Sequence, residues 1–453
     1  MKKITKIISV ILSLMIVMSC ISVSFASAAG GDFTYNTSLD YAILTRCKTS
    51  VTGKVEIPST YSGKIVKEIG GGAFSNCGNI TEIVIPSSVK KIGNNAFESC
   101  LSLEKLTFEG SICEIGKAAF AHCSALKNIE LPASLAVIPD EAFNDCTSLT
   151  SINIPSTVSL IGTEAFKMCM KLTQIDIPAS VKTIRKNAFI GCGAVKAFNV
   201  DNNNAVYSDI GGVLYGPFES SYDPDVYSAV TDKTLIQYPN GLTATSFTVP
   251  SDVKRIADYA FGENKKLTKI TLPSGLKTIE AYAFYMCSNL STISIPSGVT
   301  FIGSQAFGKC DSLKKITIPA SVTNFESAFY DSGLTEAVIE NGVKEISTRA
   351  FENCTDLESV TIPDSVERIE TGAFYNCTSL GATEIPSSVT SIGTRAFDGC
   401  SSLSIIAEEG SAAYQYAVDN GITLSQGEEE LSFFEKLIKA IMDFFAMIFS
   451  IFM

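Results

Sequence analysis

The sequence predicts a β-rich repeat solenoid, in which parallel strands stack at a 23-residue period and alternate with short helical or 3₁₀ turns. The pair Ala-Phe, followed three residues later by Cys, recurs at 23-residue intervals. A short apolar segment of the type Ile-x-Ile-Pro precedes most of these pairs and shares their period. Self-similarity at such a period is typical of stacked coils. The repeated phenylalanines are Phe74, Phe97, Phe120, Phe143, Phe166, Phe189, Phe261, Phe284, Phe307, Phe329, Phe351, Phe374 and Phe397.

The strand of each coil follows from alternation of apolar and other residues. Within residues 80–103, Ile83 and Ile85 alternate with Glu82 and Val84, which predicts a short strand with one face inward. Pro86 has no N–H to continue a ladder, so the strand should end there in a turn. Each coil can bury its apolar residues only against its neighbours, and stability is therefore expected to come from stacking.

The second half of each coil is predicted to form the opposite wall. Val89 and Ile92 should point back to the core, and Gly93 permits the corner. The segment from Ala96 to Cys100 has helical spacing, which predicts a single helical or 3₁₀ turn. One phenylalanine per coil at this fixed place indicates a core spine and not an exposed stacking platform for sugars or bases.

The cysteines follow the repeat. Of the fourteen, eleven occupy the slot after Ala-Phe, and only Cys20, Cys47 and Cys113 lie outside it. Asn264 and Ser332 fill the slot in two coils, so it accepts small side chains generally. We therefore expect a column of buried free thiols. Neighbouring coils lie about 4.8 Å apart in such a stack. This separation is within reach of a disulfide, and pairing between adjacent coils stays open.

The N-terminus has the pattern of an export signal. Lys2, Lys3 and Lys6 precede an apolar run over 7–23, and small residues over 26–28 supply a cleavage site. An uncleaved membrane anchor and lipoprotein processing at Cys20 are the alternatives. Without the three lysines, 32 basic residues face 47 acidic ones, a net charge of −15. An acidic chain without a basic patch argues against nucleic acid as a partner.

No catalytic or metal constellation stands out. The only histidine, His122, sits in a variable position before Cys123 and is expected to be an exposed surface residue. A Cys–His or Ser–His mechanism needs a base with an orienting partner, and zinc needs several clustered ligands. The sequence therefore predicts a protein that is not an enzyme and that has no cofactor.

The repeat itself resembles a known family. The unit I-x-I-P-x-S-V-x-x-I-G-x-x-A-F-x-x-C-x-x-L is similar to the BspA-type leucine-rich repeat of bacterial and protist surface proteins. Two stretches that match it well are 154–169 and 295–310, and the likeness covers nearly everything between residues 50 and 410. The resemblance implies a leucine-rich-repeat-like solenoid with parallel strands on one wall. It also implies adhesion and recognition of host or matrix, with no catalytic residues.

The largest break separates Phe189 from Phe261 by 72 residues. Two apolar runs, 211–215 and 234–239, are predicted to form a hairpin. The connection between them, 216–233, is a candidate recognition loop. It carries Phe218, Glu219, Tyr222, Asp223, Asp225 and Tyr227. A weak Ca²⁺ site at Asp223 and Asp225 and a merely tolerated surface loop are the alternatives. A smaller break at 321–334 lacks two residues and predicts a local kink.

The ends of the solenoid should be capped. Residues 33–35 and 41–43 are expected to be edge strands, 411–418 a helix stopped at Asn420-Gly421, and 422–424 a last strand. The predicted division is: signal peptide 1–29, N-terminal cap and first strand 30–72, leucine-rich repeats 73–194, irregular repeat with hairpin and loop 195–247, leucine-rich repeats 248–410, C-terminal cap and linker 411–426, and amphipathic helix 427–453.

The last segment is predicted to be an amphipathic helix with a broad apolar face. Its apolar arc carries Phe433, Phe434, Phe444, Phe445, Phe449 and Phe452. The uncharged run after Asp443 has ten residues, short of the roughly 20 needed to span a bilayer. The helix is expected to lie in a membrane interface, to cap the solenoid, or to mediate self-association.

These observations predict a secreted protein, either released or retained at the cell surface, that binds a host or matrix protein or glycan through its solenoid. A structural surface component without a specific ligand is the alternative.

Overall fold

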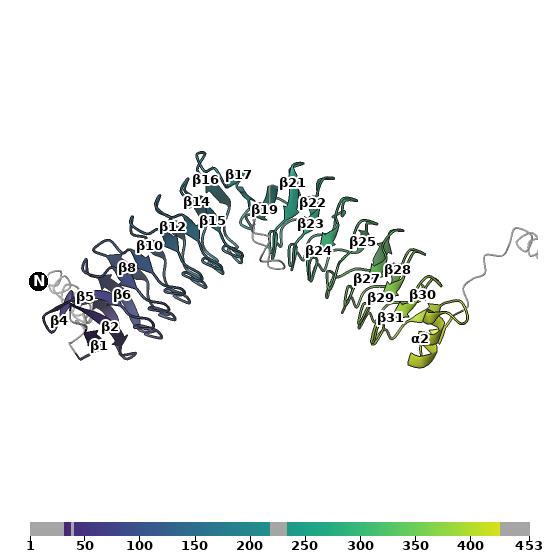
Figure 1. Ribbon diagram of the computed structural model, residues 1–453, viewed down its shortest axis with the longest axis horizontal. Helices are drawn as coiled ribbons and strands as arrows, with labels where there is room; N and C mark the ends of the chain where they lie inside the picture. Colours follow the sequence, from purple (N-terminus) through teal and green to yellow (C-terminus); the bar gives the residue numbers. More distant parts are fainter. Residues whose placement is uncertain (1–30, 38–39, 218–232, 426–453) are drawn as a thin grey trace, which may run out of the picture. The chain divides into compact units, whose positions relative to one another are not determined.

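The computed structural model of the protein describes residues 31–37, 40–217 and 233–425. The chain divides into two compact units, Met1–Glu219 with Tyr238–Leu242 and Ser220–Gln237 with Thr243–Met453. Within each unit, coils of similar size stack along the chain with parallel strands (Figure 1). The predicted repeat solenoid is confirmed.

In the first unit, two rows of strands run along the stack. The strand wall is formed by β3 (Gly53–Glu56), β6 (Ile80–Ile85), β8 (Lys105–Phe108), β10 (Asn128–Glu130), β12 (Ser151–Asn153), β14 (Gln174–Ile177) and β16 (Ala197–Val200). The second row is β5 (Lys64–Ile69), β7 (Lys91–Ile92), β9 (Glu114–Ile115), β11 (Val137–Ile138), β13 (Leu160–Ile161) and β15 (Thr183–Ile184). Glu82 pairs with Lys105, which is the predicted 23-residue register. Ile83 and Ile85 are buried, as the alternation predicts.

The second unit repeats this plan. Its strand wall holds β20 (Ser246–Thr248), β22 (Lys269–Thr271), β25 (Lys315–Ile318), β26 (Glu336–Ile339), β28 (Ser359–Thr361), β30 (Ala382–Glu384) and β32 (Ser404–Ile406). The second row holds β19 (Lys233–Gln237), β21 (Val253–Ile256), β23 (Thr278–Ile279), β24 (Phe301–Ile302), β27 (Glu345–Ile346), β29 (Arg368–Ile369) and β31 (Ser391–Ile392).

The repeated phenylalanines form a stacked column in the core of each unit. In the first unit the ring centroids of Phe97 and Phe120 lie 5.3 Å apart with planes 2° from parallel. In the second, those of Phe351 and Phe374 lie 5.3 Å apart at 6°. These spacings match the favourable range for aromatic pairs. All of these rings are at most 3% exposed. The predicted core spine is confirmed.

Tilted aromatic rings close both ends of each phenylalanine column. In the first unit, Phe33 packs on Phe74 at 6.0 Å and 64°, and Phe198 packs on Phe189 at 5.3 Å and 61°. In the second unit, Phe247 covers Phe261 and Tyr416 covers Phe397, with centroids 5.9 and 6.0 Å apart. These four rings remove the terminal phenylalanine faces from water, which is the function of a cap.

The wall that carries Ala-Phe corrects one expectation. We call the seven residues from two before the alanine to the cysteine slot, such as 94–100, the turn wall. In place of the expected helical or 3₁₀ turn, each coil has consecutive β-turns with two left-handed residues. In this coil they are Asn95, with φ 57°, and Ser99, with φ 58°. Helical spacing of apolar residues therefore did not require helical backbone here.

The left-handed residues turn alternate N–H groups toward the next coil. Asn95, Phe97 and Ser99 donate to carbonyls 22 residues ahead at 2.9, 2.8 and 2.9 Å. Glu98 and Cys100 bond within their own coil instead, to the Asn95 carbonyl at 3.1 Å and to the Phe97 carbonyl at 3.2 Å. The turn wall is thus a hydrogen-bonded ladder without being a β-sheet. These bonds offset the cost of left-handed backbone, about 1–2 kcal/mol per residue.

The corner glycine has a steric reason. A Cβ on Gly162 would lie 2.4 Å from the Asp140 nitrogen and 2.5 Å from the Pro139 carbonyl carbon of the preceding coil. Gly93, Gly116, Gly303 and Gly393 show the same approach at 2.4–2.5 Å. Each glycine allows two coils to approach at the corner.

The caps combine predicted and unpredicted elements. The expected edge strands are β1 (Phe33–Thr37) and β2 (Tyr41–Cys47), which pair antiparallel, and a short hairpin joins β4 (Thr60–Tyr61) to β5. At the other end, α2 (Ala412–Asn420) begins after the N-cap Ser411 and ends at the left-handed Gly421, followed by β33 (Thr423–Leu424). Helix and final strand confirm the expectation. Among the described residues, no helix has both the length and the apolar run that a bilayer span needs.

The irregular repeat contains a hairpin that the sequence did not indicate. β17 (Ser208–Ile210) pairs antiparallel with β18 (Val213–Gly216) across Gly211 and Gly212, both of which have positive φ. The two predicted apolar runs are strands, β18 and β19. The connection between them, residues 218–232, lies outside the described residues.

Candidate functional site

The cysteine slot has a hydrogen-bonding role in addition to packing. The Cys123 thiol donates to the Phe97 carbonyl at 3.1 Å, and that carbonyl also accepts the Cys100 N–H at 3.2 Å. Both lone pairs of the carbonyl are therefore used. Burial raises the pKa of the Cys123 thiol to about 12. The same thiol contact occurs at Cys100, Cys146, Cys169, Cys192, Cys287, Cys310, Cys354, Cys377 and Cys400.

The ladder of the second unit ends at the last coil, 394–400. In the preceding coil, Gly372 N–H donates to the Thr394 carbonyl at 3.1 Å and Asn376 N–H to the Asp398 carbonyl at 2.7 Å. The equivalent donors of the last coil are Arg395 and Gly399, also left-handed with φ of 59° and 81°. Neither N–H has an acceptor among the described residues. Of the three ladder donors, only Phe397 N–H is engaged, at 3.5 Å by the Tyr416 hydroxyl.

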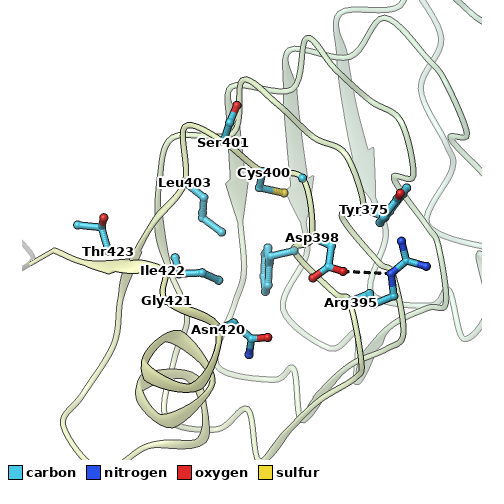
Figure 2. Close-up of a pocket in the computed structure, with 12 residues that line it drawn as sticks. Tyr375, Arg395, Asp398, Cys400, Ser401, Leu403, Asn420, Gly421, Ile422 and Thr423 are labelled. Atoms are coloured by element: carbon cyan, nitrogen blue, oxygen red, sulfur yellow. Dashed lines mark hydrogen bonds and ion pairs between the residues drawn. The ribbon is translucent and has the colours of Figure 1, made fainter.

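A groove of about 580 Å³ lies beside these donors, between the last coil and the C-terminal cap (Figure 2). We call it the end groove. The coil side contributes Tyr375, Arg395, Phe397, Asp398, Gly399, Cys400, Ser401 and Leu403, and the cap side contributes Asn420, Gly421, Ile422 and Thr423. The groove exists because α2 covers the phenylalanine column but not the rest of the turn wall, where another coil would otherwise stack.

Both charges at the rim of the end groove are paired. Arg395 Nε lies 3.0 Å from Asp398 Oδ2, and the guanidinium carbon lies 4.6 Å from the centroid of the Tyr375 ring (Figure 2). This distance is within the range in which a cation is attracted to the face of an aromatic ring. The rim therefore offers a positioned side chain of each sign with no net charge, beside the two unpaired N–H groups.

Cys400 ends the thiol column inside the end groove. It is partly exposed, whereas the other cysteines of the repeat slot, which we call the ladder cysteines, are buried. Interaction between the two neighbouring thiols lowers the pKa of Cys400 and raises the pKa of Cys377. The last thiol is thus the most accessible of the column and has the more easily formed thiolate of this pair. All thirteen cysteines in the described part of the chain are free thiols.

A second groove, of about 620 Å³, lies on the strand wall of the first unit. It is lined by residues 104–108 and 110 of one coil and 127–132 of the next. β8 pairs with β6, and β10 pairs with β12. An ion pair between Glu104 and Lys127, 2.7 Å long, bridges the two coils. This groove is a local opening of the strand wall, with charged groups at one edge.

The other residues predicted from the sequence lie apart from both grooves or outside the described chain. His122 is partly exposed, and its Nδ1 lies 3.1 Å from Asp145 Oδ2, in a side-chain hydrogen bond to the next coil. No group of three His, Cys, Asp or Glu side chains within the described residues is arranged to hold a metal ion. The candidate recognition loop, from Phe218 to Tyr227, and the candidate tail, from Phe433 to Phe452, lie outside the described residues.

Sequence reasoning missed the end groove. The available signal was that the coil around Phe397 is followed by a helix pattern and not by another Ala-Phe unit. It therefore has no successor for its ladder donors. The left-handed positions that aim these donors carry many residue types, so no residue pattern marked them.

Comparison with known proteins agrees with this architecture. Residues 67–196, 238–355 and 325–413 match the family described as BspA type Leucine rich repeat region. No curated protein matches the chain in sequence. Among solved structures, a leucine rich cell surface protein from Faecalibacterium prausnitzii is 26% identical, with a TM-score of 0.53 over 88% of this chain and 97% of that one.

Two further structures extend the comparison. A leucine-rich repeat protein from Eubacterium ventriosum is 27% identical, with a TM-score of 0.57 over 81% of this chain and 94% of that one. The pneumococcal vaccine antigen PcpA shares the fold at 23% identity, with a TM-score of 0.63 over 87% of this chain and 96% of that one. With the family matched over most of its length and the same stacked coils in both units, the chain belongs to the BspA-type leucine-rich repeat family.

Proposed function

We propose that this chain is a secreted or cell-surface protein that acts as a binding or adhesion module for a host or matrix protein or glycan. The observation that carries the proposal is its likeness to the Faecalibacterium prausnitzii cell surface protein, which extends over nearly the whole of that chain. Likeness over the full repeat array supports a shared use of the array itself.

The strand wall supports binding because its outward positions form continuous rows. In the first unit, Glu130, Asn153 and Asp176 are exposed, and Glu130 and Asn153 are register partners on adjacent strands. In the second unit, Thr248 and Thr271 are exposed register partners. At these positions the first unit presents acidic and amide groups, and the second presents hydroxyl groups. Extended surfaces of this kind are what solenoids use to bind.

The experiment is a glycan and matrix-protein array probed with the secreted protein. We expect at least one ligand to be retained above background. Glu130→Arg should weaken capture if the strand wall of the first unit binds. Glu263→Arg, an exposed charge reversal on a turn wall, is the matched control and should bind like the wild type. An array with no specific ligand, for a protein that is nevertheless displayed at the surface, would favour the alternative of a structural surface component.

Export is part of the same proposal. The predicted signal peptide 1–29 lies outside the described residues, so it remains a sequence prediction. Mass spectrometry of the secreted protein should find an N-terminus at Gly30. Protein that stays in the membrane fraction with Met1 or an acylated Cys20 at its start would instead indicate an anchor.

The C-terminal segment is proposed to contact a membrane surface or to mediate self-association. Truncation after Gln426, followed by liposome flotation and size-exclusion chromatography, tests both roles. Binding through the six phenylalanines would be hydrophobic and nearly independent of salt. Identical behaviour of truncated and full-length proteins in both assays would remove this part of the proposal.

A further inference from the structure

The last coil of the second unit keeps the donor side of the ladder without a coil to receive it. Arg395 and Gly399 have the same left-handed backbone as Gly372 and Asn376, which hold the equivalent positions of the preceding coil. Both residues of the last coil are exposed, and both line the end groove. In each preceding coil of this wall, the equivalent N–H groups donate to carbonyls of the next coil. The N–H groups of Arg395 and Gly399 therefore point to the place where those carbonyls would lie.

An acceptor is also open at the same place. The Phe374 carbonyl receives both the Cys377 N–H, at 3.1 Å, and the Cys400 thiol, at 3.0 Å. The Phe397 carbonyl receives the Cys400 N–H at 3.1 Å, and no thiol of a following coil exists among the described residues. The end groove thus presents two donors and one half-used acceptor, all of them main-chain groups in the ladder arrangement.

We propose that the end groove binds a peptide segment of a partner protein, whose carbonyls accept the Arg395 and Gly399 N–H groups and so continue the turn-wall ladder. Exposed backbone donors at the edge of a ladder are a template for an added chain. The volume of about 580 Å³ is in the range of pockets that enclose small ligands, roughly 300–1,000 Å³. This site is separate from the strand wall, so its failure would leave the proposed function standing.

A partner peptide fits better than a second copy of the chain stacked end to end. Such stacking would bring the donors of the last coil to the carbonyls of the first coil, around Ala73. That edge is covered, because the Cys47 N–H of the N-terminal cap donates to the Ala73 carbonyl at 2.6 Å. The N-terminal cap, whose Phe33 also packs on Phe74, therefore lies against the first coil where a second copy would have to stack.

The probe is a fluorescent synthetic peptide with the sequence of residues 325–334, which is a turn-wall segment without cysteine. In the protein, the Ser327 and Tyr330 carbonyls of this segment accept N–H groups of Gln305 and Lys309, each at 3.1 Å. Hydrogen–deuterium exchange of the full chain should slow at residues 394–400 when the peptide is added. Exchange at the equivalent residues 371–377 should not change, and a scrambled peptide should have no effect.

Two tryptophan variants test whether the groove is the binding place. Ser401→Trp fills the groove from its coil side and should weaken peptide binding, measured by anisotropy, by at least about tenfold, or 1.4 kcal/mol. Thr355→Trp changes the same exposed slot two coils earlier and should bind within about twofold of the wild type. Thermal melting shows whether both variants are folded.

Three outcomes would overturn the proposal. One is unchanged exchange at 394–400 at saturating peptide. Another is equal binding by both tryptophan variants, since the peptide would then bind elsewhere. The third is slow exchange at 394–400 in the full chain before any peptide is added, which would mean that the chain's own residues fill the groove. None of these outcomes affects ligands captured on the array, so the two proposals fail separately.

Discussion

Single residues hold adjacent coils together at three recurring places. The corner glycine allows close approach, the left-handed residues aim N–H groups forward, and the thiol fills the second lone pair of a phenylalanine carbonyl. Hydroxyls add a fourth contact in the turn that follows the strand wall, since Ser180 Oγ donates to the Val158 carbonyl at 2.6 Å and Ser388 Oγ to the Val366 carbonyl at 2.9 Å. This contact explains the serine of the repeated Pro-x-Ser-Val segment.

Replacing the corner glycine should be costly where backbone lies behind it. Gly162→Ala forces a Cβ against the Asp140 nitrogen at 2.4 Å. We expect a loss of about 3 kcal/mol or more in the free energy of unfolding, as for overpacking that backbone must absorb. Gly78→Ala is the control, because no neighbouring atom lies within 4 Å of the position that its Cβ would take. Chemical denaturation should separate the two variants, and equal stability would contradict the steric account.

The column of buried thiols should make the free energy of unfolding fall at alkaline pH. The pKa of Cys123 is raised to about 12 in the folded protein, against about 8.5 when unfolded. A raised folded pKa gives stability that is complete below the unfolded value and is lost as pH rises toward the folded value. Ionisation of the unfolded thiol at pH 10 should therefore remove about 2 kcal/mol per buried thiol.

The Cys123→Ala variant isolates this effect. At pH 7 it should be less stable than the wild type by about 2 kcal/mol, because it loses a hydrogen bond and some packing. Most of that difference should vanish at pH 10, since the variant has no thiol to ionise at this place. Leu126→Ala, which removes a buried side chain without a titrating group, should cost the same at both pH values. A Cys123→Ala penalty independent of pH would contradict the buried-thiol assignment.

At the scale of elements, the two walls differ in how well sequence predicts them. The strand wall follows from apolar alternation at Ile83 and Ile85. The turn wall does not, because left-handed positions hold Tyr282, Glu164 and Met168 as well as asparagine and glycine. Stacking contacts impose the backbone there and outweigh local preference. Periodicity therefore located the buried residues correctly but could not distinguish a helical turn from two β-turns.

The C-terminal cap begins with a side-chain contact at the N-terminus of its helix. Ser411 Oγ accepts the Tyr414 N–H at 3.2 Å, and α2 then places Tyr416 over Phe397. Ser411→Ala should lower the free energy of unfolding by about 1 kcal/mol. It should also speed hydrogen exchange over 412–420. Ser411→Asp keeps an N-cap acceptor and should restore both the free energy of unfolding and the slow exchange. Equal exchange rates in Ser411→Ala and Ser411→Asp would show that packing alone sets the cap.

At the scale of the whole chain, the sequence predicted the solenoid, its period, its core columns and both types of cap. Repetition makes these features predictable, because the same residue types recur at the same places in each coil. The end groove arises where repetition stops, from the last coil and a helix whose docking the repeat does not encode. Of the site residues predicted from the sequence, those in the loop and in the tail remain predictions.

Buried free thiols link the coils, and each thiol column is protected along its length. Residue-resolved alkylation without reductant is the sharpest test of this arrangement. In native protein, the exposed Cys113 and the partly exposed Cys400 should be labelled, and the buried ladder cysteines should react only after denaturation. Ladder cysteines that remain unlabelled after denaturation would reveal disulfides between coils, and ladder cysteines labelled throughout the native protein would reveal an open core. Either result would rule out a column of buried free thiols.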